Sequence, residues 1–553
     1  MLPISRVKLV LEPPLTEPPR VRVRHWLLLA VALVALNVAV TFHNVWPTLW
    51  VVPHAELSVE VAALLLALVA WTSFVRPLGR IAWWLAVLLV LVLVLGRYAE
   101  VTAPALYGRP VNLYWDAQHL PKVAAMLAAV GPWWLVLLGA LGLVTLLTAL
   151  VAGIKWSLNR VAHLLGERTP RRVLGALAGL VVAHYAVSHT LDWPSQYQYS
   201  LPVASTYLQQ ARFTFAAYTT DRNRKLPIVP LTPSNLGRLE GDDVLLMFLE
   251  SYGAVTYDVA AIARVVAPAR DELAHAAAET GRRVVSAYAA SPTFGGGSWL
   301  AHASFMSGFT ISEPGDYMLL LTQQRDTWPK LFKSAGYRAV AVMPGMKSAW
   351  PEGTFYGFDT IYDERAVGYG GPDFGWWRIP DQFSLANIAT LEARTESHAP
   401  LFTFLPTINT HIPFLPVPPY QKDWQQVLTA EPFEAAAVAA SLEQVPDWEA
   451  LSGPYAESFV YTFTYLAGYL REHPGADEVL VLIGDHQPAA SVTGVGARWD
   501  VPVHIVTSRD DIAAALLAAG FVEGVALAPQ QRPVVNLSEL SALLLRTFDA
   551  PPQ

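Results

Sequence analysis

The 553-residue sequence contains no cysteine, and only 15% of its residues are charged. The first absence excludes disulfide bonds, thiolate metal ligands and a cysteine nucleophile. A soluble protein of this size would have about a quarter of its residues charged, so the low fraction of charged residues indicates a membrane-embedded part. The net charge is -7 and the later two thirds contain no long basic patch, which excludes a nucleic-acid partner.

Apolar residues concentrate in five runs within the first third of the chain. A hydrocarbon core about 30 Å thick needs roughly 20 helical residues, so the third run, flanked by Arg80 and Arg97, is the marginal one. A cleaved signal peptide does not explain the first run, because four more follow it. We therefore predict an α-helical membrane domain of five spans over residues 1–192. The runs are about Trp26 to Trp46, Ser58 to Val75, Ile81 to Gly96, Trp133 to Ile154 and Val173 to Leu191.

Basic residues predict the orientation of these spans. They gather before the first run, between the second and third, and between the fourth and fifth. Segments rich in lysine and arginine stay in the cytoplasm, so the N-terminus is predicted to be cytoplasmic. With an odd number of spans, everything after about Asp192 is then extracytoplasmic. The residues concerned are Arg6, Lys8, Arg20, Arg22, Arg24, Arg76, Arg80, Lys155, Arg160, Arg168, Arg171 and Arg172.

The predicted spans contain the polar residues Asn37, Glu60, His184 and His189. Polar groups are costly in hydrocarbon, so they could mark a lipid or proton path. The alternative is a structural role near span ends or helix interfaces.

From Gly241 onward, short aliphatic runs alternate with helical stretches. Apolar strands separated by helices indicate a mainly parallel central sheet in an α/β sandwich, here over residues 241–553. Residues 193–240 lack strong periodicity and are predicted to be an extracytoplasmic linker. The predicted strands are Val244 to Leu249, Arg283 to Ala287, Arg338 to Val342, Leu401 to Leu405, Val479 to Ile483 and Val503 to Val506.

Polar residues follow two of these strands. Glu250 comes directly after the first, and Asp485 and His486 follow the run that ends at Ile483 and Gly484. Ligands collect beyond the carboxyl ends of strands in such folds. Carboxylates with an imidazole form a mixed donor set suited to zinc or manganese. The alternative for Asp485 and His486 is a turn in which the aspartate caps and the histidine packs.

A third element is the segment Ser291-Pro-Thr-Phe-Gly-Gly-Gly-Ser298, which precedes a helix-compatible run. A serine at a helix start is usually an N-cap. A nucleophile needs similar surroundings, with helix N–H groups facing an anion and a nearby cation that lowers the pKa of the hydroxyl. The N-cap interpretation gives no reason for three consecutive glycines.

Together these motifs resemble the sulfatase-type domain of lipoteichoic acid synthase and related membrane phosphoglycerol transferases, in the alkaline phosphatase superfamily. Further similar stretches are Leu331-Phe-Lys-Ser-Ala-Gly-Tyr337 and Asn409-Thr-His-Ile-Pro-Phe414. The resemblance implies five spans, a linker and an extracytoplasmic alkaline-phosphatase-like domain.

The resemblance also implies roles for individual residues. Glu250, Ser298, Asp485 and His486 match the ligands of one divalent metal ion, typically manganese, with zinc or magnesium as alternatives. Ser298 takes the place of a nucleophilic threonine, and His411 matches a histidine that contacts substrate.

Three departures bear on the substrate. Serine replaces threonine at Ser298, which keeps the hydroxyl chemistry. Trp350 aligns with a tryptophan of the family, but Glu352 replaces a basic residue that grips glycerol phosphate, so the headgroup stays open. The Cys/Ser-x-Pro-x-Arg pattern from which sulfatases make formylglycine is absent around Ser298, which argues against a sulfate esterase.

Other residues have two interpretations. His302 lies one helical turn after Ser298 and could donate a proton or contact an anion, or could pack structurally. His411 follows a strand and could bind substrate or be a satisfied loop histidine. A set of side chains could line the cleft or belong to the core: Trp350, Trp376, Trp377 and Arg378.

The predicted function is a membrane-anchored, metal-dependent transferase or hydrolase that cleaves phosphodiesters through a covalent Ser298 intermediate. We expect phosphoglycerol transfer from a lipid donor such as phosphatidylglycerol to an envelope glycan or lipid. If the acceptor is water instead, the enzyme is a hydrolase. The predicted location is the bacterial plasma (inner) membrane, multi-pass, with a periplasmic catalytic domain. One alternative is a sulfuric-ester or phosphoric-ester hydrolase of small soluble esters, and another is a catalytically silent membrane scaffold.

Overall fold

The computed structural model describes residues 23–45, 48–75, 79–107, 111–112, 116, 124, 133–190, 198–220, 226–347, 350, 352–393, 399–475 and 477–550. The chain divides into two compact units. The helical unit comprises the described residues of 1–43, 53–97 and 140–205, and the sheet unit comprises those of 44–52, 98–139 and 206–553. Each is described by itself.

Four helices of the described residues are long and apolar enough to cross a membrane. They are α1 (Val23–Thr41), α3 (Arg80–Tyr107), α5 (Trp133–Leu165) and α6 (Arg168–Thr190). The second predicted run instead forms the 16-residue helix α2 (Val59–Phe74), shorter than the roughly 20 residues a span needs. The structure therefore has four such helices where five spans were predicted.

The short helix is the second and not, as predicted, the third. Ser58 caps α2, with its side chain accepting a hydrogen bond from the Val61 amide, and Pro77 in the sequence disfavours helix beyond Val75. The third run continues past Gly96 into the 28-residue α3. The buried Arg97 is stabilised there because its Nε donates to the carbonyl of Phe42 at 2.9 Å.

Polar residues of the predicted spans have partners within the helical unit. The Asn37 side chain donates to the Glu56 carbonyl at 2.7 Å, and Glu60 Oε1 accepts from the Ala204 amide at 2.7 Å. His184 Nδ1 lies 2.9 Å from the Tyr199 hydroxyl. These contacts favour the structural alternative. Three further elements precede the central sheet in the chain: β1 (His43–Asn44), β2 (Val51–Val52) and α7 (Val203–Thr220).

A nine-stranded sheet forms the centre of the sheet unit, and all six strands predicted from the sequence are present. The strand order is β10-β4-β9-β8-β3-β7-β5-β6, with β11 beside β4. Only β9 and β10 run against the others, so the sheet is mainly parallel as predicted. The strands are β3 (Asp243–Leu249), β4 (Arg283–Ala290), β5 (Arg338–Met343), β6 (Thr360–Asp363), β7 (Leu401–Pro406), β8 (Glu478–Gly484), β9 (Asp500–Thr507), β10 (Val522–Glu523) and β11 (Val535–Asn536).

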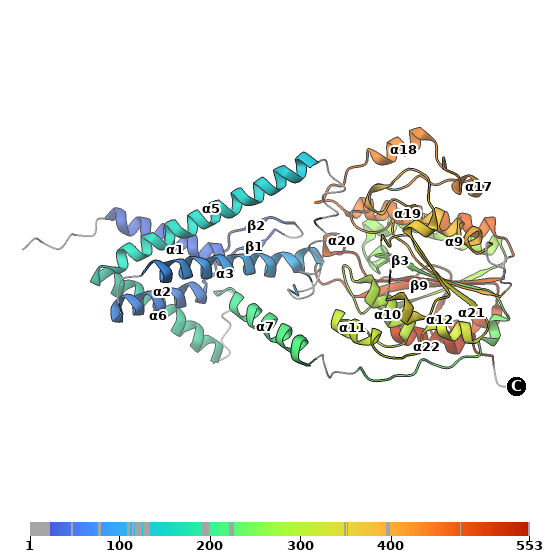
Figure 1. The fold of residues 1–553 in the computed structure, drawn as a ribbon, viewed down its shortest axis with the longest axis horizontal. Coiled ribbons are helices and arrows are strands. Elements are labelled where there is room, and N and C mark those ends of the chain that lie inside the picture. Colours follow the sequence, from blue (N-terminus) through green and yellow to red (C-terminus); the bar gives the residue numbers. More distant parts are fainter. Residues whose placement is uncertain are drawn as a thin grey trace, which may run out of the picture. The chain divides into compact units, whose positions relative to one another are not determined.

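Helices cover both faces of this sheet, which gives the α/β sandwich expected from the sequence. In Figure 1, α9 (Ala260–Glu279) and α19 (Ser452–Glu472) lie on one face, and α10 (Ser298–Ser307), α12 (Trp328–Ser334), α21 (Asp510–Ala518) and α22 (Leu537–Phe548) lie on the other. Alternate residues of β3 enter the two cores, with Leu246 and Phe248 in one and Leu245 and Met247 in the other.

Shorter helices fill the connections. They are η1 (Gly237–Leu239), α8 (Val255–Asp258), α11 (Pro314–Leu321), α13 (Gly353–Tyr356), α14 (Glu364–Val367), η2 (Gly375–Trp377), α15 (Asp381–Ala386), α16 (Ile388–Glu392), α17 (Trp424–Val427), α18 (Ala435–Leu442) and α20 (Ala490–Thr493). Leu226, Leu231 and Leu236, which precede the domain start predicted at residue 241, are buried in the core of the sheet unit. The boundaries at residues 193 and 241 stay a prediction.

Candidate metal centre and nucleophile

The candidate site lies where three neighbouring parallel strands end. Leu249 at the end of β3 pairs with Gly484 at the end of β8, so Glu250 and Asp485 leave the sheet side by side. The loop after β7 fixes the backbone of Glu250. Thr407 Oγ1 accepts from the Glu250 amide at 3.0 Å, and Thr410 Oγ1 donates to the Glu250 carbonyl at 2.6 Å.

Ser298 is the first residue of α10, and Gly297 holds the N-cap position with no side-chain cap. The N-cap interpretation of this serine is therefore wrong. The three glycines have φ angles of 65°, 136° and 82° at Gly295, Gly296 and Gly297. Residues with a Cβ rarely adopt such angles, which is the physical reason for the glycine run. The run brings the serine into the loop beyond the strand ends.

The Ser298 side chain points at two of the predicted metal ligands. Its Oγ lies 2.9 Å from Glu250 Oε2 and 3.1 Å from His486 Nε2. A neutral hydroxyl has one proton and can donate to only one of these acceptors. One of the two acceptor atoms, Glu250 Oε2 or His486 Nε2, is therefore left without a hydrogen bond from Ser298.

The protonation of His486 follows from its other ring nitrogen. Nδ1 lies 2.7 Å from the Gln487 carbonyl oxygen, which can only accept, so Nδ1 bears the proton and Nε2 presents a lone pair. The same carbonyl accepts from the Gly295 amide at 3.0 Å. The Gln487 carbonyl thus orients the histidine and anchors the glycine run that carries Ser298.

Asp485 is fully buried and has one oxygen without a partner. Its Oδ1 accepts from the amides of Ser251 and His486, at 2.8 and 2.6 Å. Oδ2 is buried and has no hydrogen-bond donor among the described residues. A buried carboxylate oxygen without a partner is costly, and a bound cation would remove that cost.

The ligand atoms of Glu250, Asp485 and His486 lie within 4.8 Å of one another. His486 Nε2 is 3.5 Å from Glu250 Oε1 and 3.7 Å from Asp485 Oδ2. A metal ion about 2.0–2.2 Å from each donor could occupy the space they surround. The surplus of acceptors and this spacing both fit a divalent cation, so the structure brings together the four predicted ligands, Ser298 included.

Burial and neighbouring charges shift the pKa values of Glu250, Asp485 and His486 in different directions. Burial alone would raise the pKa of Glu250, but interactions with His486 and His411 and the hydrogen bonds it accepts lower that pKa to about 2. Burial, and then the charge of Glu250, raise the pKa of Asp485 well above its usual value. Burial lowers the pKa of His486, which favours the neutral imidazole that a metal ligand requires.

His411 lies at the edge of this cluster. Its Nδ1 donates to the Ile412 carbonyl at 2.8 Å, so its Nε2 is the nitrogen available to a ligand. Its ring centroid is 4.6 Å from that of Trp377, and its electrostatic interaction with Glu250 contributes to the low pKa of that carboxyl group. This position is compatible with the predicted substrate contact, which stays a prediction.

No sequence pattern indicated Asp381, a buried residue that holds the loop before His411. Its Oδ1 accepts from the Ile408 amide at 2.8 Å, and its Oδ2 accepts from the Asn409 amide at 2.9 Å. The Asp381 amide donates in return to the Asn409 side chain at 2.6 Å. Only the tertiary contact between the start of α15 and the loop after β7 identifies this role.

His302 lies under the cluster and packs between two phenylalanines. Its ring centroid is 4.5 Å from that of Phe248 and 5.5 Å from that of Phe404. Burial lowers its pKa to about 3, so the ring is neutral. This environment favours the packing alternative considered for His302.

The side chains predicted to line the cleft, Trp350, Trp376, Trp377 and Arg378, do not form one group. Trp350 packs on Tyr356, with ring centroids 5.4 Å apart, and against the core of the sheet unit. Arg378 pairs with Glu364 at 2.5 Å and Asp373 at 2.8 Å, so two carboxylates offset its charge. The Trp376 side chain falls outside the described residues.

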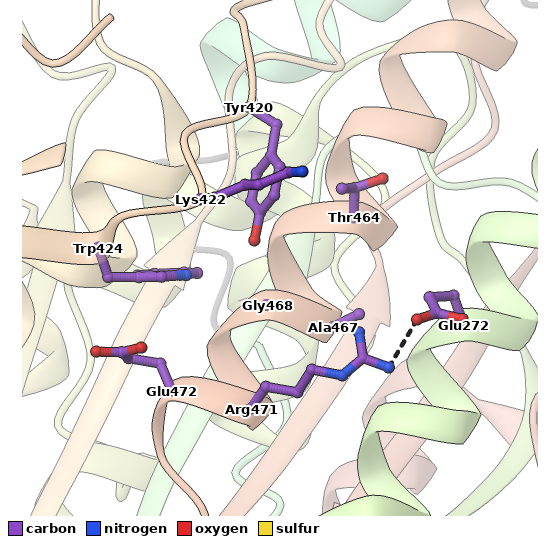
Figure 2. A pocket seen from close by; sticks show the side chains of 9 residues that line it. All are labelled: Glu272, Tyr420, Lys422, Trp424, Thr464, Ala467, Gly468, Arg471 and Glu472. Carbon is purple, nitrogen blue, oxygen red and sulfur yellow. Dashed lines mark hydrogen bonds and ion pairs between the residues drawn. The ribbon is translucent and has the colours of Figure 1, made fainter. Parts of the chain in front are cut away.

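A pocket of about 320 Å³ lies elsewhere on the sheet unit and contains none of the predicted site residues. Figure 2 shows Arg471 in this pocket bonded to Glu272, at 2.6 Å. The candidate site is therefore the cluster at the strand ends and not this pocket. The pocket is lined by Glu272, Tyr420, Lys422, Trp424, Thr464, Ala467, Gly468, Arg471 and Glu472.

No protein-family model and no curated protein matches the sequence. Several solved structures are similar to it. A lipoteichoic acid synthase, LtaP, from Listeria monocytogenes is 17% identical over 50% of this chain and 67% of that one, with a TM-score of 0.33. A protein in the alkaline phosphatase superfamily from Vibrio parahaemolyticus is 16% identical over 60% and 75%, with a TM-score of 0.36.

An integral membrane protein, lipooligosaccharide phosphoethanolamine transferase A (EptA) from Neisseria meningitidis, is similar over both parts of the chain. The match covers 94% of this chain and 95% of that one, at 13% identity and a TM-score of 0.46. At these identities the similarities concern the fold alone.

Proposed function

We propose that this protein is a membrane-anchored, metal-dependent enzyme that cleaves a lipid phosphodiester through Ser298. It transfers the phosphoglycerol group of a donor such as phosphatidylglycerol to an envelope glycan or lipid. The observation that carries the proposal is the position of the Ser298 hydroxyl, 2.9 Å from Glu250 Oε2 and 3.1 Å from His486 Nε2, beside the unpaired Oδ2 of Asp485.

Glu250, Asp485 and His486, with Ser298, would hold one divalent metal ion, for which the family resemblance suggests manganese. When bound, this ion would lower the pKa of the serine hydroxyl and neutralise charge on the phosphoryl oxygens. The backbone of the chain supports the same chemistry. Ser298 begins a ten-residue helix, and the free N–H groups of a helix start favour a negatively charged group.

The reaction has two steps in this proposal. A bond forms between Ser298 Oγ and phosphorus, and the ester bond from phosphorus to the diacylglycerol oxygen breaks, so that diacylglycerol leaves as an alcohol. An acceptor hydroxyl then attacks the same phosphorus, and Ser298 recovers its proton. His411, whose Nε2 presents a lone pair when Nδ1 bears the proton, is proposed to accept the proton that Ser298 loses in the first step and to pass it to the leaving oxygen.

Membrane attachment supports a lipid donor. Four helices in the part of the chain that the structure describes are long and apolar enough to cross a bilayer. An enzyme fixed to a membrane meets its donor in two dimensions and does not need to extract it into water. We propose that the apolar 16-residue helix α2 is a fifth, short span, so that the N-terminus is cytoplasmic and the sheet unit is exposed on the periplasmic side, as the distribution of basic residues predicts.

The test is an assay of purified full-length protein in detergent with manganese and fluorescent phosphatidylglycerol. We expect wild type to release fluorescent diacylglycerol and Ser298→Ala to release none. Ser307→Ala is the matched control, because Ser307 lies on the same helix and bonds only the Ala303 carbonyl among the contacts described for it. Absence of diacylglycerol with wild type would refute the phosphatidylglycerol assignment.

A panel of other substrates separates the alternatives. Release of chromophore from a small phosphodiester or sulfate ester, dependent on Ser298, would instead indicate a hydrolase of soluble esters. No turnover of any substrate and no bound metal would indicate a silent scaffold.

A further inference from the structure

A second cluster of metal-ligating side chains lies in the helical unit, in the connection between α1 and α2. It consists of His43, His54 and Glu56, whose ligand atoms all lie within 4.8 Å of one another. The cluster contains no residue of the Ser298 site. Nothing in the proposed reaction uses it.

The two histidines approach opposite oxygens of one carboxylate. His43 Nε2 lies 3.0 Å from Glu56 Oε2, and His54 Nδ1 lies 3.4 Å from Glu56 Oε1. The two imidazole rings lie against each other, with centroids 4.1 Å apart and planes at 30°. Donor atoms bound to one tetrahedral ion at about 2.0–2.1 Å would be separated by roughly 3.3 Å. The two nitrogen–oxygen distances, one to each oxygen of Glu56, are close to that value, and one ligand atom from each of the three residues lies within 4.8 Å of the others.

The carboxylate is built into the protein and is not a surface charge. The Glu56 side chain is only 10% exposed, whereas those of His43 and His54 are 41% and 48% exposed. A carboxylate buried to this extent needs a compensating charge. The two imidazole nitrogens face its two oxygens, and a cation bound among them would supply that charge.

Neighbouring hydrogen bonds fix the backbone that carries Glu56 and His43. The Asn37 side chain spans the Glu56 turn, donating to the Glu56 carbonyl at 2.7 Å and accepting from the Ser58 amide at 2.9 Å. Arg97 donates to the carbonyl of Phe42, directly before His43, at 2.9 Å. A metal site requires ligands held in place in this way, and the support comes from buried or partly buried residues of α1 and α3.

We propose that His43, His54 and Glu56 bind one zinc ion, in a site distinct from the Ser298 centre. Two imidazole nitrogens and one carboxylate oxygen form a donor set that zinc favours over magnesium or calcium. Three protein ligands leave the fourth position of a tetrahedral ion to water. The ion joins the connection after α1 to the start of α2, at one end of two apolar helices.

The test is the zinc content of full-length protein in detergent, stripped with a chelator, reloaded with zinc and measured by mass spectrometry. We expect the double variant His43→Gln/His54→Gln to contain one zinc ion fewer per chain than wild type. The matched control is His25→Gln/His163→Gln, a histidine pair of the same unit with centroids 6.0 Å apart and no carboxylate partner among the described residues. This control should keep the wild-type content.

A separate variant, Glu250→Gln/Asp485→Asn, reports on the Ser298 centre alone. Its metal loss should add to that of His43→Gln/His54→Gln. If Glu250→Gln/Asp485→Asn left the metal content unchanged while His43→Gln/His54→Gln lowered it, the proposed catalytic centre would be wrong and the second site would stand. Wild-type zinc content in His43→Gln/His54→Gln would overturn the second site.

Cobalt provides a measurement that does not depend on variants of the cluster folding well. In the Glu250→Gln/Asp485→Asn background, bound Co²⁺ should give the intense visible absorption of a tetrahedral site. Glu56→Gln in that background should abolish it. Absence of the absorption in the background protein, at saturating Co²⁺, would also overturn the proposal.

Discussion

The Ser298 hydroxyl donates to Glu250 Oε2 at 2.9 Å, although the two residues are 48 positions apart. Glu250 follows β3 and Ser298 begins α10, and the glycine run before Ser298 closes the distance between them. The same hydroxyl contacts His486, which follows β8. The position of one serine therefore depends on three separate segments, and each can be tested by substitution.

Ser298→Thr should retain activity, because threonine keeps the hydroxyl, whereas Ser298→Ala should lose at least about 1000-fold in kcat/KM. Rates of diacylglycerol release from phosphatidylglycerol measure both. Metal content should be measured in parallel, since alanine also removes a ligand. Equal loss in Thr and Ala variants would contradict the role of the hydroxyl.

Gly296→Ala should lower activity through the backbone. A Cβ at Gly296 meets no atom within 4 Å, but the φ of 136° is one that alanine rarely adopts. We expect a loss of about 1–2 kcal/mol in stability, or a displaced Ser298 and a lower kcat. Gly370→Ala is the control, because it also has open space and its φ lies outside the left-handed region. It should leave both quantities unchanged.

Asp381→Asn should reduce kcat by roughly 10- to 100-fold while metal content stays at the wild-type level. The amide places an N–H₂ group where a carboxylate oxygen now accepts from the Ile408 or Asn409 backbone, so the loop that carries His411 shifts. Asp423→Asn, at the exposed N-cap of α17, is the control. Loss of metal along with activity would point instead to a general folding defect.

Asp485→Asn should stabilise the metal-free protein while abolishing metal binding at the Ser298 centre. Asparagine can still accept from the Ser251 and His486 amides, and it removes a buried carboxylate whose Oδ2 has no donor. We expect a gain of about 1–2 kcal/mol in the presence of chelator, and a loss relative to wild type when metal is added. Urea unfolding followed by tryptophan fluorescence measures both.

Glu478 should make the sheet unit less stable as pH rises. Burial raises its pKa to about 7 from the usual 4.5, although hydrogen bonds from the Tyr469 hydroxyl oppose the shift. Its folded-state pKa is above the unfolded value, so its contribution to stability is complete below about pH 4.5 and lost as pH rises through about 7. The full difference is roughly 3 kcal/mol.

The measurement is the free energy of unfolding at several pH values between these limits, for wild type and Glu478→Gln. Glutamine cannot ionise, so its curve should fall less steeply with pH. Parallel curves for the two proteins would refute the assignment. The comparison is required because burial raises the pKa of Asp381 to about 7 as well, and that group contributes with the same sign.

The sequence alone was sufficient to predict the strands and the residues at their ends. Buried strands need continuous apolar residues, so the runs ending at Leu249 and Ile483 identified β3 and β8 and hence Glu250, Asp485 and His486. The glycine run before Ser298 was visible because strained backbone needs glycine. The sequence did not determine the length of α3, which continues to Tyr107 beyond the run that ends at Gly96, because the buried Arg97 is stabilised by its hydrogen bond to the Phe42 carbonyl.

Tertiary structure decided everything that depends on contacts between distant segments. Asp381 belongs to no recognisable sequence motif, and only the fold brings its carboxylate next to the backbone amides of Ile408 and Asn409. His302 shares a helix face with Ser298, but the surrounding phenylalanines decide that it packs. Periodicity and composition are local properties of a chain, whereas burial, protonation and ligand geometry arise from long-range packing. The cluster of His43, His54 and Glu56 became visible for the same reason.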